Sequence, residues 1–514
     1  MKVLAKINSG AVVGLDTVAV TVEVDVASGG LPSFTIVGLP DKAVEESRER
    51  VRAAIKNSGA DFPARQVTVN LAPADLPKVG PAYDLPIALG LLIASGQLEG
   101  TFENVFIFGE LSLDGKLRST NGVLPLVMLA KKAGMQSVFL PDVNAQEASI
   151  IDKIKIYPIS SLTVLLKHLK GLGKIYPAEY HPLEKLLDGQ PEDLGFDFAD
   201  IVGQEQAKRA MEIAAAGSHN VFLQGPPGAG KTMLSRAMAG ILPAMTEDEA
   251  LEVTKIYSVT GNLPIGDSII KHRPFRSPHH TTSRIGLIGG GSIPTPGEIS
   301  LAHRGVLFLD EFAEFPRNVL EALRQPIEDK MVSVARARRT THFPANFVLV
   351  AASNPCPCGY LYDEVRHCIC LPGQVIRYQK RLSGPIMDRI DLHIEVPTVQ
   401  VEKLTAINNP RETSASIKKR VQKARERQLE RFRGTPLKSN GDMGTRDVRT
   451  FCSLSSECLT LLGQAAARFG LSARGYFRIV KVAMTIADLE ESNQISTNHV
   501  AEALQYRPRA TAGE

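Results

Sequence analysis

The sequence has 514 residues, of which 59 are basic and 55 acidic, so its formal net charge is only +4. The composition, 44% hydrophobic and 22% charged, is that of a globular protein and excludes a disordered or collagen-like chain. So small a net charge argues against a uniformly basic coat for nucleic acid, although it does not describe local patches.

No targeting or membrane-spanning segment stands out. The first residues lack the continuous apolar stretch of a signal peptide. The longest apolar run, Leu85 to Ser95, contains a proline and a glycine and falls short of the roughly 20 residues that a bilayer requires. Six cysteines in so long a chain do not form a disulfide framework. We therefore expect a cytoplasmic protein with no membrane contact.

Three zones follow one another along the chain. In residues 1–180, β-branched runs alternate with helical patterns; the expected strands are 18–26, 67–70, 105–108 and 137–140, and the expected helices are 41–57 and 84–95. A polar stretch, 181–197, is expected to be a linker. Residues 198–396 alternate apolar strands with helices, as a parallel α/β sheet does. Residues 397–514 are expected to be α-helical, with helices near 414–432, 455–469 and 475–492.

A complete P-loop pattern lies between an apolar strand at 221–223 and a helical pattern that begins near Met233. Its residues are Gly225, Pro226, Pro227, Gly228, Ala229, Gly230, Lys231 and Thr232. Small residues let backbone N–H groups wrap a polyphosphate at a helix N-terminus. Lys231 would reach the β- and γ-phosphates of ATP, and the Thr232 hydroxyl would bind Mg²⁺. The alternative is a glycine-proline turn that matches by chance, but the flanking strand and helix favour the P-loop.

Two further strands are predicted to end in polar side chains. The apolar run 305–309 leads into Asp310, which suits water-mediated Mg²⁺ binding, and Glu311, which would orient and polarise the attacking water. Solvated acids at a strand end are the alternative, but beside a complete P-loop the pair favours hydrolysis. The run 347–352 leads to Asn354, which would lie beside Asp310 if the strands are neighbours; Asn-Pro is also a plain turn signal.

With the Ile-Val-Gly-Gln stretch at 201–204, these motifs resemble those of AAA+ ATPases. More specific are RPFRSPHHT at 273–281, three glycines at 289–291 and PGEISLAH at 296–303, which are similar to the magnesium-chelatase-like branch, in particular the ComM (also called YifB) family. The resemblance covers essentially the whole chain. It implies an α/β fold with an AAA+ core at 198–396 and a helical lid within 397–514. It further implies ATP and Mg²⁺, a homo-hexameric ring, and a DNA helicase that promotes branch migration in homologous recombination and natural transformation.

The same resemblance implies roles for three residues. Asn354 corresponds to sensor 1, Arg389 to the arginine finger that reaches a neighbouring subunit's γ-phosphate, and Arg474 to the sensor 2 arginine, in cis or in trans. An arginine supplied in trans makes hydrolysis depend on assembly. On the residues alone, a structural ion pair is the simpler interpretation of either arginine.

Two basic segments are candidates for DNA contact. Residues 331–350 have the pattern of strand, tight turn and strand, and Arg336, Arg338 and Arg339 would neutralise backbone phosphates without reading sequence. The His/Arg-rich segment 271–284 is a second candidate, and the basic helix with Lys/Arg residues from 418 to 433 a third. These side chains would otherwise face solvent or pair across subunits. Residues 331–433 hold 18 Lys/Arg against 9 Asp/Glu, so the near-neutral total conceals a local excess of positive charge.

Four cysteines, Cys356, Cys358, Cys368 and Cys370, bracket the loop 356–370 in two Cys-x-Cys pairs. Four thiolates can form a tetrahedral Zn²⁺ site that holds a loop with no core of its own. Because the spacing is not the common Cys-x₂-Cys pair, free or redox-active thiols remain the alternative. Cys452 and Cys458 are expected to be packing residues.

Residues 1–180 resemble the proteolytic domain of Lon, an α+β fold shared with a ribosomal protein (ribosomal S5 domain 2-like). Segment 78–84 matches the part that carries Lon's nucleophilic serine, but here that position is Ala82, and the position of the partner lysine is Leu124. A Ser–Lys mechanism needs both groups, so we expect no peptidase activity and a structural or partner-docking role. Lys78, Asp75 and Asp84 are expected at the surface or as caps.

Other function classes are weaker. A protein-remodelling ATPase of the magnesium chelatase type is the main alternative, although that motor subunit lacks the Lon-like domain. A Lon-like protease is disfavoured by Ala82 and Leu124, and a nucleotide-binding scaffold without catalysis is disfavoured by Glu311.

Overall fold

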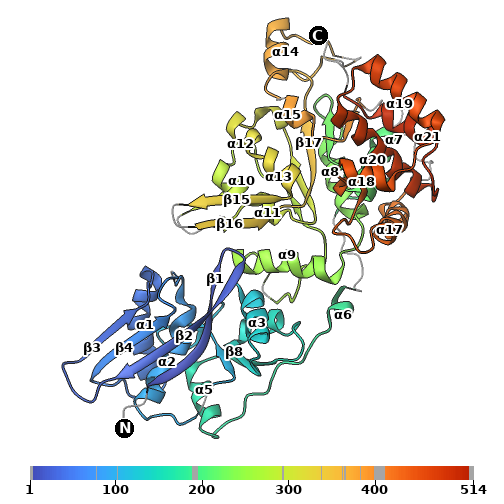
Figure 1. Ribbon diagram of the computed structural model, residues 1–514. Coiled ribbons are helices and arrows are strands. Elements are labelled where there is room, and N and C mark those ends of the chain that lie inside the picture. Colours follow the sequence, from blue (N-terminus) through green and yellow to red (C-terminus); the bar gives the residue numbers. More distant parts are fainter. Residues whose placement is uncertain are drawn as a thin grey trace. The chain divides into compact units, whose positions relative to one another are not determined.

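The computed structural model describes residues 4–76, 78–100, 102–187, 195–264, 266–291, 294–336, 339–361, 363, 366–382, 384–398 and 411–508. The chain divides into two compact units (Figure 1). The first comprises residues 1–189 and 246–271, and the second comprises 190–245 and 272–514. Among the described residues, no helix is both long and apolar enough to cross a bilayer.

A mixed seven-stranded sheet organises the first unit, in the order β3-β4-β2-β1-β5-β8-β9. The strands are β1 (Ala5–Val13), β2 (Asp16–Val26), β3 (Ser33–Val37), β4 (Gln66–Ala72), β5 (Val105–Ile107), β8 (Ser137–Pro141) and β9 (Lys155–Ile159). Strand β2 pairs antiparallel with both β1 and β4, and the other neighbours are parallel. A short hairpin, β6 (Glu110–Leu111) and β7 (Leu117–Arg118), lies outside this sheet.

Helices cover both faces of this sheet. They are α1 (Lys42–Asn57), α2 (Asp84–Ala94), α3 (Val123–Lys132), α4 (Ala145–Ala148), α5 (Leu162–Leu169) and α6 (Leu183–Leu187). Because successive strand residues point to opposite faces, Phe106 and Val138 join one core with α3 and α4, whereas Ile107 and Phe139 join another with α1, α2 and α5. The strands and helices expected in residues 1–180 are confirmed, with ends shifted by a few residues.

The segment 246–271 folds with this first unit, although it lies within the range 198–396 expected for the AAA+ core. Its helix α9 (Glu247–Thr260) begins with a capping box between Thr246 and Glu249 and packs Leu251 against the core that contains α3. The N–H of Gly122 donates to the carbonyl of Ser258 at 2.9 Å. Sequence alone does not reveal this packing, because the amphipathic pattern of a helix marks its buried face without identifying its partner.

The second unit is built on a five-stranded sheet in the order β11-β14-β17-β10-β18, whose neighbours are all parallel. The strands are β10 (Val221–Gln224), β11 (Phe275–Arg276), β14 (Val306–Leu309), β17 (Val348–Ser353) and β18 (Leu392–Glu395). The central strands β14 and β17 are buried along their whole length, as expected of a parallel sheet covered on both faces. The carboxyl ends of these strands therefore meet at one edge.

Helices and two short hairpins surround this sheet. The helices among the sheet strands are α7 (Glu205–Gly217), α8 (Lys231–Ile241), α10 (Arg284–Ile288), α11 (Glu298–Leu301), α12 (Arg317–Ala322), α13 (Arg324–Asp329), α14 (Pro372–Gln379) and α15 (Gly384–Met387). Strands β12 (Gly289–Gly290) and β13 (Thr295–Pro296) form one hairpin, and β15 (Met331–Arg336) and β16 (Arg339–Pro344) form the other.

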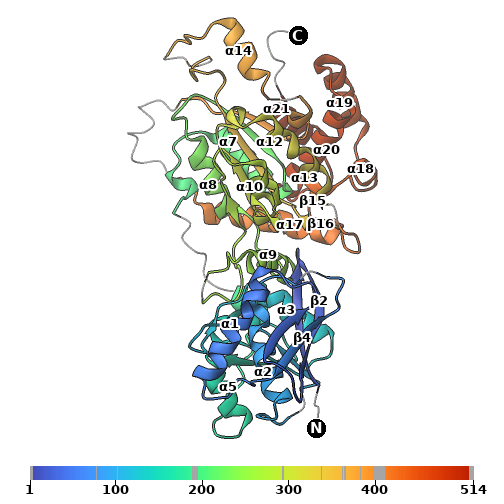
Figure 2. The same ribbon diagram turned by 90° about the vertical axis from the view of Figure 1, so that its left-hand side faces the viewer.

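The C-terminal part of the second unit is helical, as predicted (Figure 2). Its helices are α17 (Ser414–Arg431), α18 (Thr445–Phe451), α19 (Ser456–Phe469), α20 (Ala473–Leu489) and α21 (Thr497–Gln505). Buried residues of α17 and α20 belong to the same hydrophobic core as α7, α8 and β10. The predicted lid therefore packs directly on the helices that flank the P-loop strand.

Candidate active site

The P-loop motif occupies the turn from β10 into α8. Gly225 is required by close approach, because a Cβ there would lie 2.2 Å from the carbonyl oxygen of Val396. Gly228 and Gly230 have φ angles of +80° and +90°, which side chains with a Cβ rarely adopt. Helix α8, which is eleven residues long, begins at Lys231. The loop therefore presents its backbone N–H groups at the N-terminus of a helix.

Lys231 reaches back across this loop. Its buried Nζ donates to the carbonyl oxygens of Gly225 at 2.7 Å and Pro226 at 2.9 Å, and to Oδ1 of Asn354 at 3.2 Å. Burial lowers the pKa of Lys231, and the nearby Asp310 carboxylate partly opposes that shift. The Lys231 ammonium group donates to neutral oxygens, and a bound phosphate would provide a negatively charged partner for it.

The two predicted magnesium ligands are in contact. Thr232 Oγ1 donates to Oδ2 of Asp310 at 2.9 Å. Asp310 follows β14, Asn354 follows β17, and β17 lies between β14 and β10 in the sheet, which brings these residues to the P-loop. A hydroxyl and a carboxylate beside a phosphate-binding loop form a donor set that suits Mg²⁺.

Glu311 stands next to this group with its side chain 55% exposed and its backbone in the left-handed region, at φ +51°. Its Oε2 lies 3.1 Å from Nδ1 of His280, a residue of the loop that follows β11. Segment 271–284 is a candidate for DNA contact, and its sequence does not indicate this pairing. The pairing depends on β11 lying beside β14, which no local pattern shows.

The structure brings Arg389 and Arg474 together on a third residue. Nη2 of Arg389 lies 2.6 Å, and Nη2 of Arg474 3.2 Å, from the same oxygen, Oε1 of Glu328. Arg389 also donates to the carbonyl of Pro385. Glu328 belongs to no recognisable sequence motif, so the sequence does not indicate this role.

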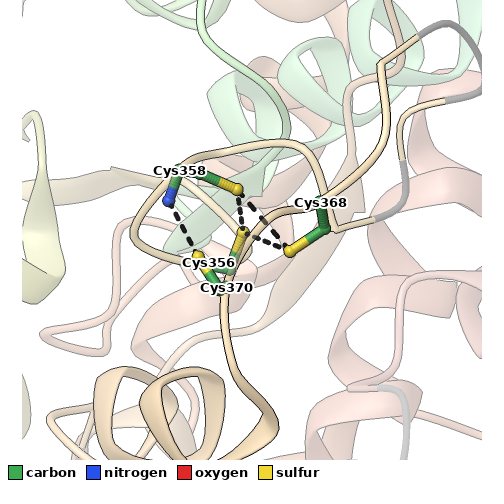
Figure 3. A group of neighbouring side chains, drawn as sticks. All are labelled: Cys356, Cys358, Cys368 and Cys370. Carbon is green, nitrogen blue, oxygen red and sulfur yellow. Dashed lines mark hydrogen bonds between the residues drawn. The ribbon is translucent and has the colours of Figure 1, made fainter.

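The four cysteines converge as predicted (Figure 3). Their Sγ atoms all lie within 4.8 Å of one another; the Cys356–Cys358, Cys356–Cys368 and Cys358–Cys368 pairs are 3.4, 3.7 and 3.6 Å apart. Zn–S bonds of about 2.3 Å in a tetrahedron place sulfur atoms about 3.8 Å apart, so this donor set fits zinc. Hydrogen bonds, chiefly from the backbone N–H of Tyr360, lower the pKa of Cys358 to about 6, whereas burial raises the pKa of Cys356 and of Cys370.

The cysteine loop also contacts the P-loop. Gly359, at φ +88°, lies so close to Pro227 that a Cβ on Gly359 would be 2.6 Å from Cδ of that proline. The loop follows β17 and Asn354 directly. A movement of the cysteine loop would therefore displace both the P-loop and Asn354.

The predicted DNA-contacting hairpin is present as β15 and β16, antiparallel with Arg336 opposite Arg339. Val332 and Val334 face the protein and are buried, as alternation predicts. The side chains of Arg336 and Arg339 and the whole of Arg338 lie outside the described residues.

The basic helix α17 has a structural role that neither earlier interpretation anticipated. Arg420 pairs with Glu212 and Glu412, and Arg431 pairs with Asp488. Arg425 is buried and donates to the carbonyl of Ala215. Arg420 and Arg425 therefore join α17 to α7, and Arg431 joins it to α20, so these three arginines have partners within the protein.

In the first unit, the positions that correspond to Lon's catalytic pair are Ala82, half-buried before α2, and Leu124, fully buried in α3. The expectation that Lys78 and Asp84 lie at the surface is wrong, since both are fully buried. Lys78 donates to the carbonyl of Pro73, and Asp84 accepts from Ser47 and from Arg50 Nε at 2.7 Å. Burial raises the pKa of Asp84, against the opposing effect of Arg50.

Together, the parallel sheet, the P-loop and the strand-end residues define the nucleotide-binding core of an AAA+ protein. Family models agree: one described as magnesium chelatase, subunit ChlI, matches residues 197–404. Another, subunit ChlI of Mg-chelatase, matches 22–144, and a third, the ChlI C-terminal region, matches 411–507.

Individual relatives narrow the family. Competence protein ComM of Haemophilus influenzae is 44% identical over 98% of this chain and 97% of its own length. YifB of Escherichia coli is also 44% identical, over 98% and 97%. Magnesium-chelatase subunit ChlI of Olisthodiscus luteus is 25% identical over 41% of this chain and 59% of its own length. The chain belongs to the ComM/YifB family of magnesium-chelatase-like AAA+ proteins, a membership that suggests ATPase activity.

Proposed function

We propose that this protein is an ATP-driven homo-hexameric motor that acts on DNA in the cytoplasm, as a helicase promoting branch migration during homologous recombination and natural transformation. The observation that carries the proposal is the convergence of Lys231, Thr232 and Asp310 in a chain that matches Competence protein ComM over 98% of its length.

In this proposal each residue at the sheet edge has one task. The P-loop backbone from Gly225 to Gly230 and Lys231 hold the ATP phosphates, and Thr232 and Asp310 hold Mg²⁺. Bound Mg²⁺ supplies the positive charge that neutralises the phosphate oxygens. Glu311 orients and polarises the attacking water, and Asn354, which contacts Lys231 at 3.2 Å, positions the phosphate end of the site.

Arg389 and Arg474 complete the site in the assembled ring. A guanidinium group beside the transferring phosphoryl group stabilises its charge, and Arg389 would reach the nucleotide of a neighbouring subunit. Rings of this kind use head-to-tail interfaces that close. Hydrolysis then depends on assembly.

DNA contact is assigned to the hairpin of β15 and β16, through Arg336, Arg338 and Arg339. The hairpin is an antiparallel two-stranded ribbon with Val332 and Val334 buried and with Arg336 opposite Arg339 at its far end. Arginines at such an end would neutralise backbone phosphates and bind without sequence preference. Arg420 and Arg431 of α17 form ion pairs within the protein. The hairpin is therefore the better candidate for DNA contact than α17.

We assign a structural Zn²⁺ to Cys356, Cys358, Cys368 and Cys370, because their sulfur distances match a tetrahedral site. Zinc there would stiffen a loop that lies against Pro227. We further propose that residues 1–180 form a Lon-like domain without peptidase activity, since Ala82 and Leu124 offer neither nucleophile nor base.

The alternative is a protein-remodelling ATPase of the magnesium chelatase type. It is favoured by the three family models, all of which carry the name of the magnesium chelatase subunit ChlI. Two relatives named as magnesium-chelatase subunits match 39% and 41% of this chain, whereas ComM matches 98%. The DNA motor therefore accounts for more of the chain.

The deciding experiment compares ATP hydrolysis by the full chain alone, with linear duplex DNA and with a four-way junction, together with strand displacement. We expect the rate of ATP hydrolysis to rise when DNA is added. We also expect the four-way junction to be separated into its duplex products. ATP hydrolysis with no DNA binding and no DNA stimulation would overturn the DNA proposal in favour of protein remodelling. In parallel, Glu311→Gln should reduce turnover by at least about a hundredfold while ATP still binds; unchanged hydrolysis would refute the assignment of Glu311.

A further inference from the structure

Glu328 brings together two arginines from distant parts of the chain. Glu328 lies near the end of α13, Arg389 in the turn after α15 and Arg474 in the first turn of α20. Both guanidinium groups contact the same oxygen, Oε1, at 2.6 and 3.2 Å. Because two positive charges at this separation repel each other, their convergence depends on the negative charge between them.

The two arginines are held differently. The Arg389 side chain is only 10% exposed, and its Nη1 donates to the carbonyl of Pro385. Its Nε is buried without a hydrogen-bond partner among the described residues. The Arg474 side chain is 64% exposed. Arg389 thus has a second contact besides Glu328, whereas Arg474 depends on Glu328 for its position.

The carboxylate itself is ionised and accessible. A hydrogen bond from Arg389, reinforced by the charges of Arg474 and Arg324, holds the pKa of Glu328 below its usual range. The Glu328 side chain is 43% exposed. Ion pairs this exposed are weak, and the fork of an arginine binds phosphate oxygens at least as well as a carboxylate. A polyphosphate can therefore replace Glu328.

We propose that Glu328 occupies the place of a phosphate oxygen: it holds Arg389 and Arg474 converged in the absence of nucleotide and yields both to the terminal phosphate of ATP. This inference rests on the proposed phosphate-binding roles of the two arginines. Glu328 is then a positioning residue that competes with the substrate, and its charge sets how readily ATP engages the arginines.

The test measures ATP binding without turnover. In a Glu311→Gln background, we compare the apparent Kd for ATP with and without Glu328→Gln, at protein concentrations where the subunits assemble. Removing the competing charge should tighten ATP binding by about three- to tenfold, because the arginines no longer have to leave an internal anion. In the chain that keeps Glu311, Glu328→Gln should lower KM for ATP more than it changes kcat.

Matched variants separate this effect from a structural one. Glu491→Gln, just after α20, removes another exposed carboxylate, which pairs with Lys423 at 3.1 Å, and should leave the Kd unchanged. Adding Arg474→Ala to Glu328→Gln should abolish the gain in affinity. If Glu328→Gln lowers the melting temperature, Glu328→Asp, which keeps the charge but shortens the side chain, should give a smaller gain in ATP affinity.

The failure of this inference is distinct from a failure of the nucleotide site. ATP binding that is absent in Glu311→Gln, or that survives Lys231→Ala, would overturn the proposed nucleotide site itself. ATP binding that depends on Lys231 but is unchanged or weakened by Glu328→Gln would overturn the competing role of Glu328 alone.

Discussion

His280 and Glu311 come from loops that follow neighbouring strands, and their side chains meet 3.1 Å apart. The imidazole is held from two sides, by His279 with ring centroids 4.1 Å apart and by Phe315 at 6.4 Å in an edge-on arrangement. A ring fixed in this way can orient the carboxylate that the proposed mechanism assigns to the attacking water. It also restrains the exposed Glu311 side chain.

His280→Ala should therefore lower kcat for ATP hydrolysis by about tenfold and leave KM for ATP nearly unchanged, because Glu311 would lose its orientation but the phosphate contacts would remain. His280→Asn, which can still donate a hydrogen bond, should recover part of the loss. Steady-state kinetics of both variants provide the measurement. A loss confined to KM would show that His280 contributes to nucleotide binding and not to the position of Glu311.

Thr232 allows a similarly narrow test. Thr232→Val keeps the shape of the side chain but removes the hydroxyl that contacts Asp310 at 2.9 Å. The Mg²⁺ concentration for half-maximal ATP hydrolysis should rise by at least about tenfold, since a metal ligand is lost. Thr232→Ser retains the hydroxyl and serves as the control. An identical Mg²⁺ dependence in all three proteins would contradict the proposed metal site.

At the residue scale, the sequence predicts the site residues that belong to short, continuous motifs. The P-loop, Asp310 and Glu311 are each found by short spacings next to a strand or helix. His280 and Glu328 were missed because their partners come from strand order and from helices distant in the chain. Lys78 and Asp84 are expected at the surface or as caps because charged residues are rarely buried, yet both have partners in the interior.

Among the elements, the cysteine loop between β17 and α14 links the proposed zinc site to the nucleotide site. Cys368→Ser removes one of four thiols and should lower bound zinc from about one per chain to near zero. ATP binding should weaken as well, because Gly359 of the loop lies against Pro227. Metal analysis and ATP titration of protein purified without chelator measure both effects.

Cys452→Ser is the matched control for this prediction. Cys452 is a buried cysteine at the C-terminal end of α18 whose sulfur lies 4.0 Å from that of Met443. This change should leave zinc content and ATP affinity unaltered. Wild-type protein with no zinc would remove the metal proposal and leave the four thiols as a redox or packing cluster.

Strand β18 carries a histidine that should make stability depend on pH. Burial, followed by the charge of Arg478, lowers the pKa of His393 to about 4, although nearby Asp391 opposes the shift. An exposed histidine in the unfolded chain has a pKa near 6.5. Between these values the unfolded state binds more protons, so the free energy of unfolding falls as pH decreases from about 6.5 to 4, by at most about 3 kcal/mol.

Chemical denaturation followed by circular dichroism at pH 7, 6, 5 and 4 tests this prediction. His393→Gln should show a smaller loss of stability over that range than the unaltered chain, because the glutamine does not titrate. Both proteins retain Asp391, whose pKa is also below its usual value, so the difference between them reports His393 together with its interaction with Asp391. Parallel pH profiles would show that His393 is not responsible.

For whole elements, the sequence periodicity was informative and its limits are physical. Helices such as α1, α17 and α19 have clear capping residues and amphipathic faces, and their ends were predicted closely. The basic face of α17 was misinterpreted, because a charge pattern does not reveal whether acidic partners such as Glu212 and Asp488 lie opposite. Those partners belong to α7 and α20.

At the scale of the whole molecule, charge can now be assigned more closely. The 18 basic residues counted between 331 and 433 include Arg420, Arg425 and Arg431, which are engaged inside the second unit. The local excess that would attract DNA is therefore smaller than the count, and more of the proposed contact falls to the hairpin. Its measure is the slope of DNA affinity against salt.

Assembly gives the last functional prediction. Lys231→Ala should not bind ATP but still offers Arg389, whereas Arg389→Ala binds ATP but lacks the proposed finger. If Arg389 acts on a neighbouring subunit, a mixture of the two inactive proteins should regain part of the wild-type hydrolysis rate. Rates measured across mixing ratios test this directly. Activity no greater than the sum of the separate variants would assign Arg389 to its own subunit or to structure.

The segment 246–271 has a consequence for genetic dissection. A shortened chain that starts at residue 195 would still contain α9, but it would lack the α3 core that covers Leu251 and the Gly122 N–H that binds Ser258. Such a protein would display apolar surface and should aggregate, whatever the role of the deleted part. To learn what the N-terminal unit does, α9 must be removed with it, by joining residue 245 to residue 272 through a short flexible linker.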